Sequence, residues 1–136
     1  MKPGMLLFIF IVVGYFAFEI YAVSKVSYRT EPVYIFERFV AVDRAMNRCG
    51  QSGNDTKVDF DRNLAAVQRR AELELLEQNP SKSVNDIQAF LTQTERQQQA
   101  EVDTLIDELG CDDIELFKLV RGYENRARLN IHAPSD

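Results

Sequence analysis

An apolar segment near the amino terminus constrains this chain more than any other feature of its sequence. Residues Met5 to Val23 have no polar face, and Glu19 is the only charged residue among them. As a helix this segment would be about 30 Å long at ~1.5 Å per residue, which matches the hydrocarbon core of a bilayer. We therefore expect residues 1–23 to form a single-pass transmembrane anchor in the plasma (inner) membrane.

The charges around this segment give only weak information on its orientation. Lys2 precedes it, which favours an amino terminus inside and an extracytoplasmic domain outside, periplasmic if the source is bacterial, but Lys25 and Arg29 follow it. The alternative is a cleaved signal peptide with a small-x-small site at residues 22–24, which would release a secreted or periplasmic soluble binding protein. The bulky residues 18–21 and the short positive region count against cleavage.

Glu19 is the one ionisable group inside the predicted anchor. It lies four residues from the end of the apolar run, between Tyr15 and Tyr21. A carboxylate deep in lipid would need a partner helix or a proton path, whereas one at headgroup level would be solvated. The position near the end favours the headgroup level.

The rest of the chain is acidic. Lys2 and Glu19 are the only charged residues before Lys25, so the remainder carries the whole net charge of −5. Nucleic acid is therefore not an expected partner, because binding phosphates needs clustered Lys and Arg. We expect a linker over 24–30, one domain over 31–130 and a flexible tail over 131–136.

Helical patterns fill the expected domain and strand patterns do not occur. The signals predict a helix over 31–49 capped by Thr30, a loop over 51–57, and helices over 59–78, 83–109 and 112–129. The fold class predicted is thus all-α, a single transmembrane helix followed by a small, roughly four-helix bundle. The expected core residues are, helix by helix, Val33, Phe36, Phe39, Val40 and Met46; Phe60, Leu64, Val67, Ala71 and Leu75; Ile87, Phe90, Leu91, Val102, Leu105, Ile106 and Leu109; and Phe117, Val120 and Tyr123.

The two cysteines, Cys49 and Cys111, are predicted to form a disulfide. An even count in an exported domain favours a bridge, which would mark an oxidising compartment. In an up-down-up-down bundle the end of the first helix and the end of the third lie at the same pole, as the bridge requires. Two buried free thiols in a reducing compartment are the alternative.

The middle of the third predicted helix is unusually polar. Between residues 92 and 101 the inward positions Thr94, Glu95 and Gln98 interrupt the apolar stripe. Three interpretations stay open: a projecting helix solvated on all sides, a buried polar layer with all its hydrogen bonds made, or a groove for a ligand or partner.

Other residues are candidates for a partner surface. Tyr34 and Ile35 flank the expected core face of the first helix, where an exposed apolar patch would favour protein docking. Arg121 and Arg126 belong to a basic stretch that follows the acidic stretch 101–115, and such a bipolar surface can orient a partner. Solvated faces and helix-dipole complementarity are the simpler explanation of those charges.

No catalytic or cofactor site is predicted. His132 is the single histidine, so nucleophile–histidine pairs and a four-ligand zinc site are not expected, and no glycine-rich phosphate loop occurs. We expect no cofactor and no enzyme activity. The sequence favours a membrane-anchored extracytoplasmic protein-interaction module, such as an accessory subunit, assembly factor or regulator of a larger membrane complex.

Overall fold

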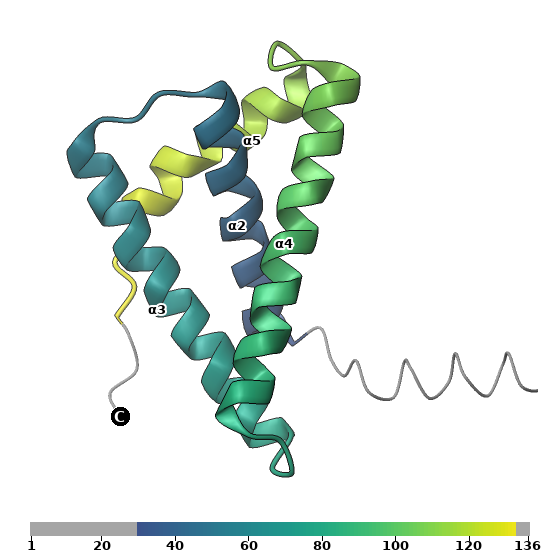
Figure 1. Ribbon diagram of the computed structural model, residues 1–136. Helices are drawn as coiled ribbons and strands as arrows, with labels where there is room; N and C mark the ends of the chain where they lie inside the picture. The colour runs from purple at the N-terminus through teal and green to yellow at the C-terminus, as the bar shows by residue number, and fades with distance from the viewer. Residues whose placement is uncertain (1–29, 133–136) are drawn as a thin grey trace, which may run out of the picture.

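The computed structural model describes residues 30–132, which form four helices (Figure 1). These are α2, Glu31–Cys49; α3, Asn54–Gln78; α4, Val84–Leu109; and α5, Ile114–Ala127. No strand occurs within this range, so the predicted all-α, four-helix domain is confirmed for the described residues. The predicted anchor over 1–23, including Glu19, lies outside them. None of the helices described has both the length and the apolar character needed to cross a bilayer.

Local capping explains where most of the helices begin. Thr30 caps α2 by accepting a hydrogen bond from the Val33 amide, and Ser83 forms a reciprocal capping box with Asp86 at the start of α4. The predicted loop over 51–57 is wrong in its second half, because α3 begins at Asn54 after Gly53. The polar residues that suggest a loop are also tolerated in an exposed first turn, where Asp55 complements the helix dipole.

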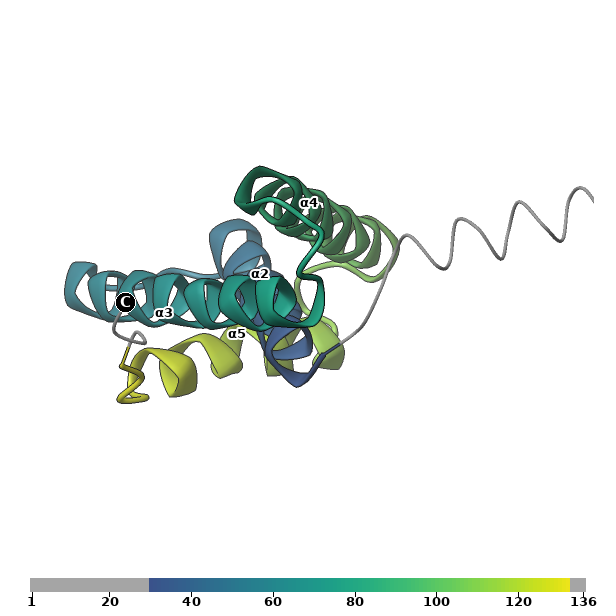
Figure 2. The same ribbon diagram turned by 90° about the horizontal axis from the view of Figure 1, so that it is seen from below.

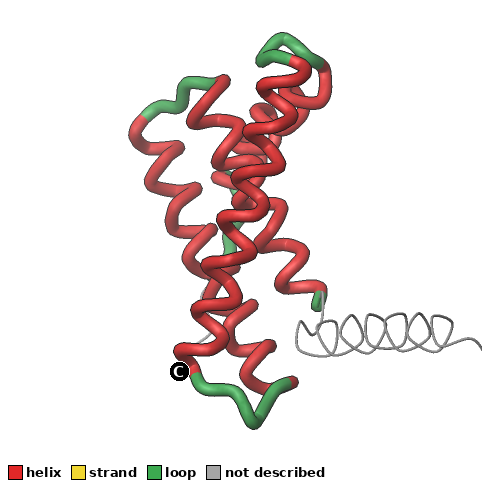
Figure 3. The backbone as a smooth tube through the Cα atoms, turned by 45° about the vertical axis from the view of Figure 1, so that its right-hand side comes forward, coloured by secondary structure: helices red, strands yellow, loops and turns green. Residues whose placement is uncertain are grey.

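The central helix is α2, which packs against α3, α4 and α5. α4 and α5 scarcely contact each other, and Figure 2 shows them at opposite sides of the bundle with α2 and α3 between them. The loops that follow α2 and α4 lie at the same pole, as the alternating arrangement predicts (Figure 3). α5 departs from that arrangement by crossing the bundle obliquely (Figure 1).

The core is built around aromatic rings on α2, α3 and α5. The Phe60 ring stacks on Tyr123 with centroids 4.0 Å apart and contacts Phe39 at 5.5 Å. The apolar stripe predicted for α2 is buried throughout, and the stripe of α3 is buried except at the partly buried Leu64. Arrangements of this kind add about 0.5–1.5 kcal/mol per ring pair to the burial of the rings themselves.

Three predicted core residues are instead exposed. Phe117 retains 51% of its surface, and Leu105 and Leu109 are also exposed. The prediction failed because it assumed that neighbouring helices cover each other, whereas α4 and α5 diverge across α2. The apolar side chains of Leu105, Leu109 and Phe117 therefore face outward or into the space between α4 and α5.

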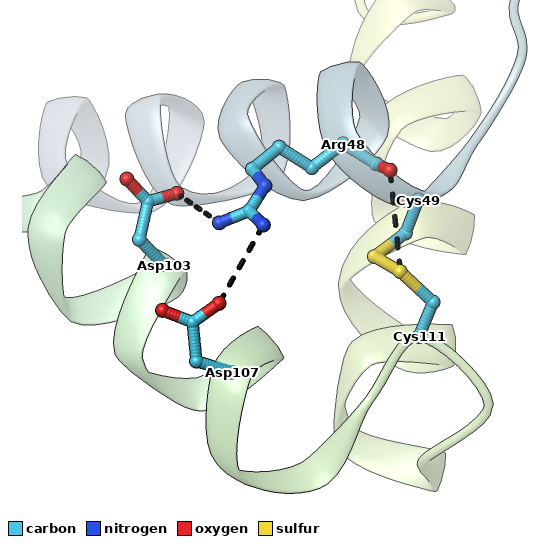
Figure 4. The surroundings of a disulfide bond; sticks show 5 residues. All are labelled: Arg48, Cys49, Asp103, Asp107 and Cys111. Carbon is cyan, nitrogen blue, oxygen red and sulfur yellow. Dashed lines mark hydrogen bonds and ion pairs between the residues drawn. A yellow bond between two sulfur atoms is a disulfide. The ribbon is translucent and has the colours of Figure 1, made fainter.

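The predicted disulfide is confirmed. The sulfur atoms of Cys49 and Cys111 are 1.99 Å apart, and the bridge joins the end of α2 to the loop between α4 and α5. Beside it, Asp103 accepts hydrogen bonds from Arg44 at 2.8 and 2.9 Å and from Arg48 at 3.0 Å (Figure 4 shows the Arg48 contacts). These bonds, first from Arg44 and then from Arg48, lower the pKa of Asp103 to about 2.

Candidate functional site

An apolar hollow with two basic side chains lies between the first turns of α2 and the end of α5. Its volume is about 440 Å³, and we call it the α2–α5 groove. Tyr34, Ile35 and Leu129 contribute exposed apolar surface to it. The full lining consists of Tyr34, Ile35, Arg38, Phe39, Asn125, Arg126 and Leu129. No carboxylate is among these residues, so the charge of the lining is positive.

Arg126 is held in a fixed place at the edge of this groove. Its guanidinium lies over the Phe39 ring, 5.5 Å from the centroid, and donates to the Gly122 carbonyl at 3.2 Å. Half-burial of the side chain, and next the charge of Arg38, lower the pKa of Arg126. Within residues 30–132 neither arginine forms an ion pair with a carboxylate. The two guanidiniums therefore repel each other without a counter-charge from the described part of the chain.

Gly122 provides the space that this arginine occupies. A Cβ atom at position 122 would lie 2.7 Å from Nη1 of Arg126 and 3.4 Å from Cγ2 of Val42. An alanine methyl group at this position would require the Arg126 guanidinium to shift from the place that it occupies beside α5.

A second hollow, which we call the α4–α5 groove, follows from the divergence of those two helices. It has a volume of about 340 Å³ and shares Arg38 and Arg126 with the first. Its other lining residues are Val42, Leu105, Glu115, Lys118 and Leu119. Lys118 is neutralised by Glu115 at 3.1 Å, which leaves the two shared arginines as the unpaired charges of the lining.

The end of α5 is fixed to α3 by a buried asparagine. Asn63 is 0% exposed, and its Nδ2 donates to the carbonyls of Arg126, Ala127 and Leu129 at 2.8, 3.2 and 2.8 Å. These carbonyls belong to the last turn of α5 and the residues just after it, where no following helical turn supplies amide donors; the Arg126 carbonyl also accepts from the Leu129 amide at 3.3 Å. Asn63 therefore positions two lining residues of the α2–α5 groove without touching the hollow itself.

The structure brings some of the predicted surface residues together and separates others. Tyr34, Ile35 and Arg126 all line the α2–α5 groove. Arg121 lies apart from it, exposed on α5, with its guanidinium 5.7 Å from the centre of the Phe117 ring. Thr94 and Gln98 on α4 line neither groove.

The polar middle of α4 is turned toward the bundle. Thr94 is 8% exposed, and Glu95 and Gln98 are partly buried. A helix solvated on all sides is therefore excluded at this point. Gln93 and Gln97 are exposed and belong to the opposite, solvated face of α4.

Sequence reasoning did not single out Arg38, Asn63, Gly122 or Leu129. Asn63 carried a usable signal, because it lies three residues after Phe60 and four before Val67, inside the apolar stripe of α3. Arg38 follows Tyr34 by four residues, one turn further along the same helix face. Gly122 and Leu129 gave no signal, since their roles depend on the position of Arg126.

The other titratable groups of residues 30–132 form no second site. Burial, and next the charge of Asp61, raise the pKa of Asp43 on α2. Asp61 itself pairs with Lys57 one turn away on α3. Across the described part of the chain, no cluster of His, Cys, Asp and Glu residues could hold a metal ion.

Comparisons with protein-family models, with curated proteins and with solved structures found no match to this chain.

Proposed function

We propose that this protein is a membrane-anchored, extracytoplasmic interaction module that binds a protein partner of a larger membrane complex. Residues 5–23 are the anchor in this proposal, and the disulfide-linked bundle is the binding domain. The bridge between Cys49 and Cys111 supports an oxidising compartment, because such bridges are rare where thiols are kept reduced.

The observation that carries the proposal is the divergence of α4 and α5 over α2. It leaves the α4–α5 groove open, with Val42, Leu105 and Leu119 in its lining. Beyond the lining, the first turns of α5 expose Ile114 and Phe117 to solvent. Exposed large apolar side chains near a preformed hollow are typical of surfaces that bury themselves against a partner.

The first experiment is the intact mass of the chain purified from its own cells. A mass of the 15.6 kDa chain less two hydrogens would support both the retained anchor and the disulfide. The mass of a chain that begins at Lys25 would refute the retained anchor and favour a released soluble binding protein. Retention of both hydrogens would argue against the oxidising compartment.

The second experiment tests the docking surface in intact cells. A photo-crosslinking residue replaces Leu105 in the α4–α5 groove or, as a matched control, exposed Gln97 two turns earlier on α4. We expect one discrete protein adduct from position 105 and none from position 97. Equal labelling at both positions would contradict a defined docking surface here.

A further inference from the structure

The α2–α5 groove combines two unneutralised cations with exposed apolar side chains. Arg38 and Arg126 are its charged residues, and no carboxylate lines it. Tyr34, Ile35 and Leu129 surround them with apolar surface that is open to solvent. A ligand that matches this lining has a compact anionic group attached to hydrocarbon.

We propose that the α2–α5 groove binds the headgroup of an anionic phospholipid from the bilayer that the chain enters, an inference that rests on the membrane anchoring proposed above. The lipid phosphate would lie between Arg38 and Arg126, because guanidinium groups bind phosphate oxygens through directed, charge-assisted hydrogen bonds. The upper acyl chains would lie along Tyr34, Ile35 and Leu129. Aromatic and long basic side chains are enriched at this depth of the membrane interface.

The length of the connecting segment places the groove within reach of the headgroups. Val23 ends the predicted anchor and Thr30 caps α2, so seven residues separate the membrane segment from the first turn of the domain. Whatever their conformation, seven residues span at most about 25 Å. Tyr34 lies in the first turn of α2 and Arg38 at the start of its third turn. The segment therefore tethers the beginning of α2 within about 25 Å of the end of the anchor, where the local concentration of lipid is high.

The overall charge of the protein makes a local site necessary for such binding. With a net charge of −5, the chain as a whole is repelled by an anionic bilayer. Attraction must come from cations that are not already paired, and Arg38 and Arg126 meet this condition within the described residues. A defined pair predicts one bound lipid per chain rather than a diffuse excess of anionic lipid.

The test is native mass spectrometry of the full-length chain released from detergent, with bound lipids counted. Phosphatidylglycerol and phosphatidylcholine with identical acyl chains are compared as probes. We expect one phosphatidylglycerol to be retained per chain. Phosphatidylcholine has the same phosphate but adds a cationic choline, which the two arginines repel, and it should bind about tenfold more weakly. Inorganic phosphate at millimolar concentration should not displace the lipid, because it cannot use the apolar surface.

Three variants test the residues. Arg38→Gln removes one exposed cation. Gly122→Ala keeps every charge but places a methyl group 2.7 Å from Nη1 of Arg126, so that the guanidinium must move. Each should reduce phosphatidylglycerol binding about tenfold, toward the level of phosphatidylcholine. The matched control is the double variant Arg70→Gln/Arg96→Gln, which changes more charge at exposed positions of α3 and α4 and should bind lipid as the native chain does.

Several outcomes would overturn the inference. They are equal binding of the two lipids, full displacement by inorganic phosphate, or the same loss in the control as in the Arg38 variant. A photo-crosslinking residue at Tyr34 that labels another protein, or a second copy of this chain, would also overturn it. Membrane retention of each preparation is measured by carbonate extraction. A retained chain without lipid preference refutes this inference alone, whereas a chain that is extracted refutes the proposed anchoring as well.

Discussion

The bonds from Asn63 to the end of α5 allow a quantitative prediction for Asn63→Ala. The side chain has two N–H groups shared among three carbonyls, so the change removes about two net hydrogen bonds, each worth roughly 1 kcal/mol. The Arg126 carbonyl keeps a backbone donor, the Leu129 amide, but the bond from Asn63 to the Ala127 carbonyl is buried, which adds about 1 kcal/mol.

An opposing contribution comes from the oxygen of the same side chain. Oδ1 of Asn63 is buried and has no hydrogen-bond partner among the described residues, so its removal returns about 1 kcal/mol. The expected net loss is therefore about 2 kcal/mol in the free energy of unfolding. In a domain of this size such a loss lowers the melting temperature by roughly 8–16 °C.

The assay is thermal unfolding of the full chain in mild detergent, followed by circular dichroism at the helical band. Gln68→Ala is the matched control, because Gln68 is an exposed amide on α3 and its removal should change the melting temperature by only a few degrees. Asn63→Asp provides the sharper comparison. The aspartate side chain has the shape of asparagine but turns a carboxylate toward three carbonyl oxygens. This variant should therefore be less stable than Asn63→Ala at neutral pH and should regain part of its stability in acid, where protonation of the carboxylate restores a hydrogen-bond donor.

Two results would refute this reasoning. A melting temperature of Asn63→Ala within about 3 °C of the native value would mean that water replaces the amide at no cost. An Asn63→Asp variant as stable as the native chain at neutral pH would show that the site is solvated rather than buried.

Three further predictions concern the disulfide, its ion pairs and the exposed apolar surface. Replacing Cys49 and Cys111 by serine opens a loop of 62 residues, which should lower the free energy of unfolding by about 4 kcal/mol in urea titrations. Reductant should then have no further effect on stability. A loss below about 1 kcal/mol would contradict the chain-entropy argument. Because the pKa of Asp103 is lowered from 3.8 to about 2 in the folded state, the contribution of this carboxylate to stability is present above pH 4 and is lost as the pH falls toward 2. The Asp103→Asn variant should be less stable than the native chain at neutral pH and should lose less stability on acidification. Parallel pH profiles of stability for the two proteins would exclude a stabilising role of the Asp103 ion pairs. Phe117→Ser should leave the melting temperature within a few degrees of the native value, because the ring is 51% exposed. The same variant should reduce partner crosslinking from position 105. A large drop in melting temperature would mean that the ring is buried.

The parts of the fold that depend on local chemistry could be predicted from the sequence. Thr30 and the Ser83–Asp86 box set the starts of two helices through bonds to residues three positions away. The stripe from Val33 to Met46 is buried because every third or fourth position of α2 meets another helix. The pairing of Cys49 with Cys111 followed from the even number of cysteines in an expected exported domain and was supported by helix order, because two reversals of direction bring the chain back to the same pole.

The parts that depend on how helices cross could not be predicted in this way. Leu105 and Phe117 have the spacing of core residues, and only the oblique path of α5 leaves them uncovered. The α2–α5 groove likewise joins residues 34–39 to residues 125–129, and no periodicity within either helix indicates that pairing. Tyr34, Ile35 and Arg126 were selected separately from the sequence, whereas Arg38 and Gly122 acquire a role only once α5 is in place.

The central position of α2 has a consequence for how the domain is made. α2 is the first of the four described helices to be synthesised, yet its buried face is covered by three helices that are all synthesised later. Phe39 meets Phe60 only when α3 has emerged, and Cys49 has no intramolecular partner until residue 111. A chain made in this order leaves the apolar face of α2 uncovered until the later helices emerge, so among the described helices α2 is the one that a holding chaperone would bind first.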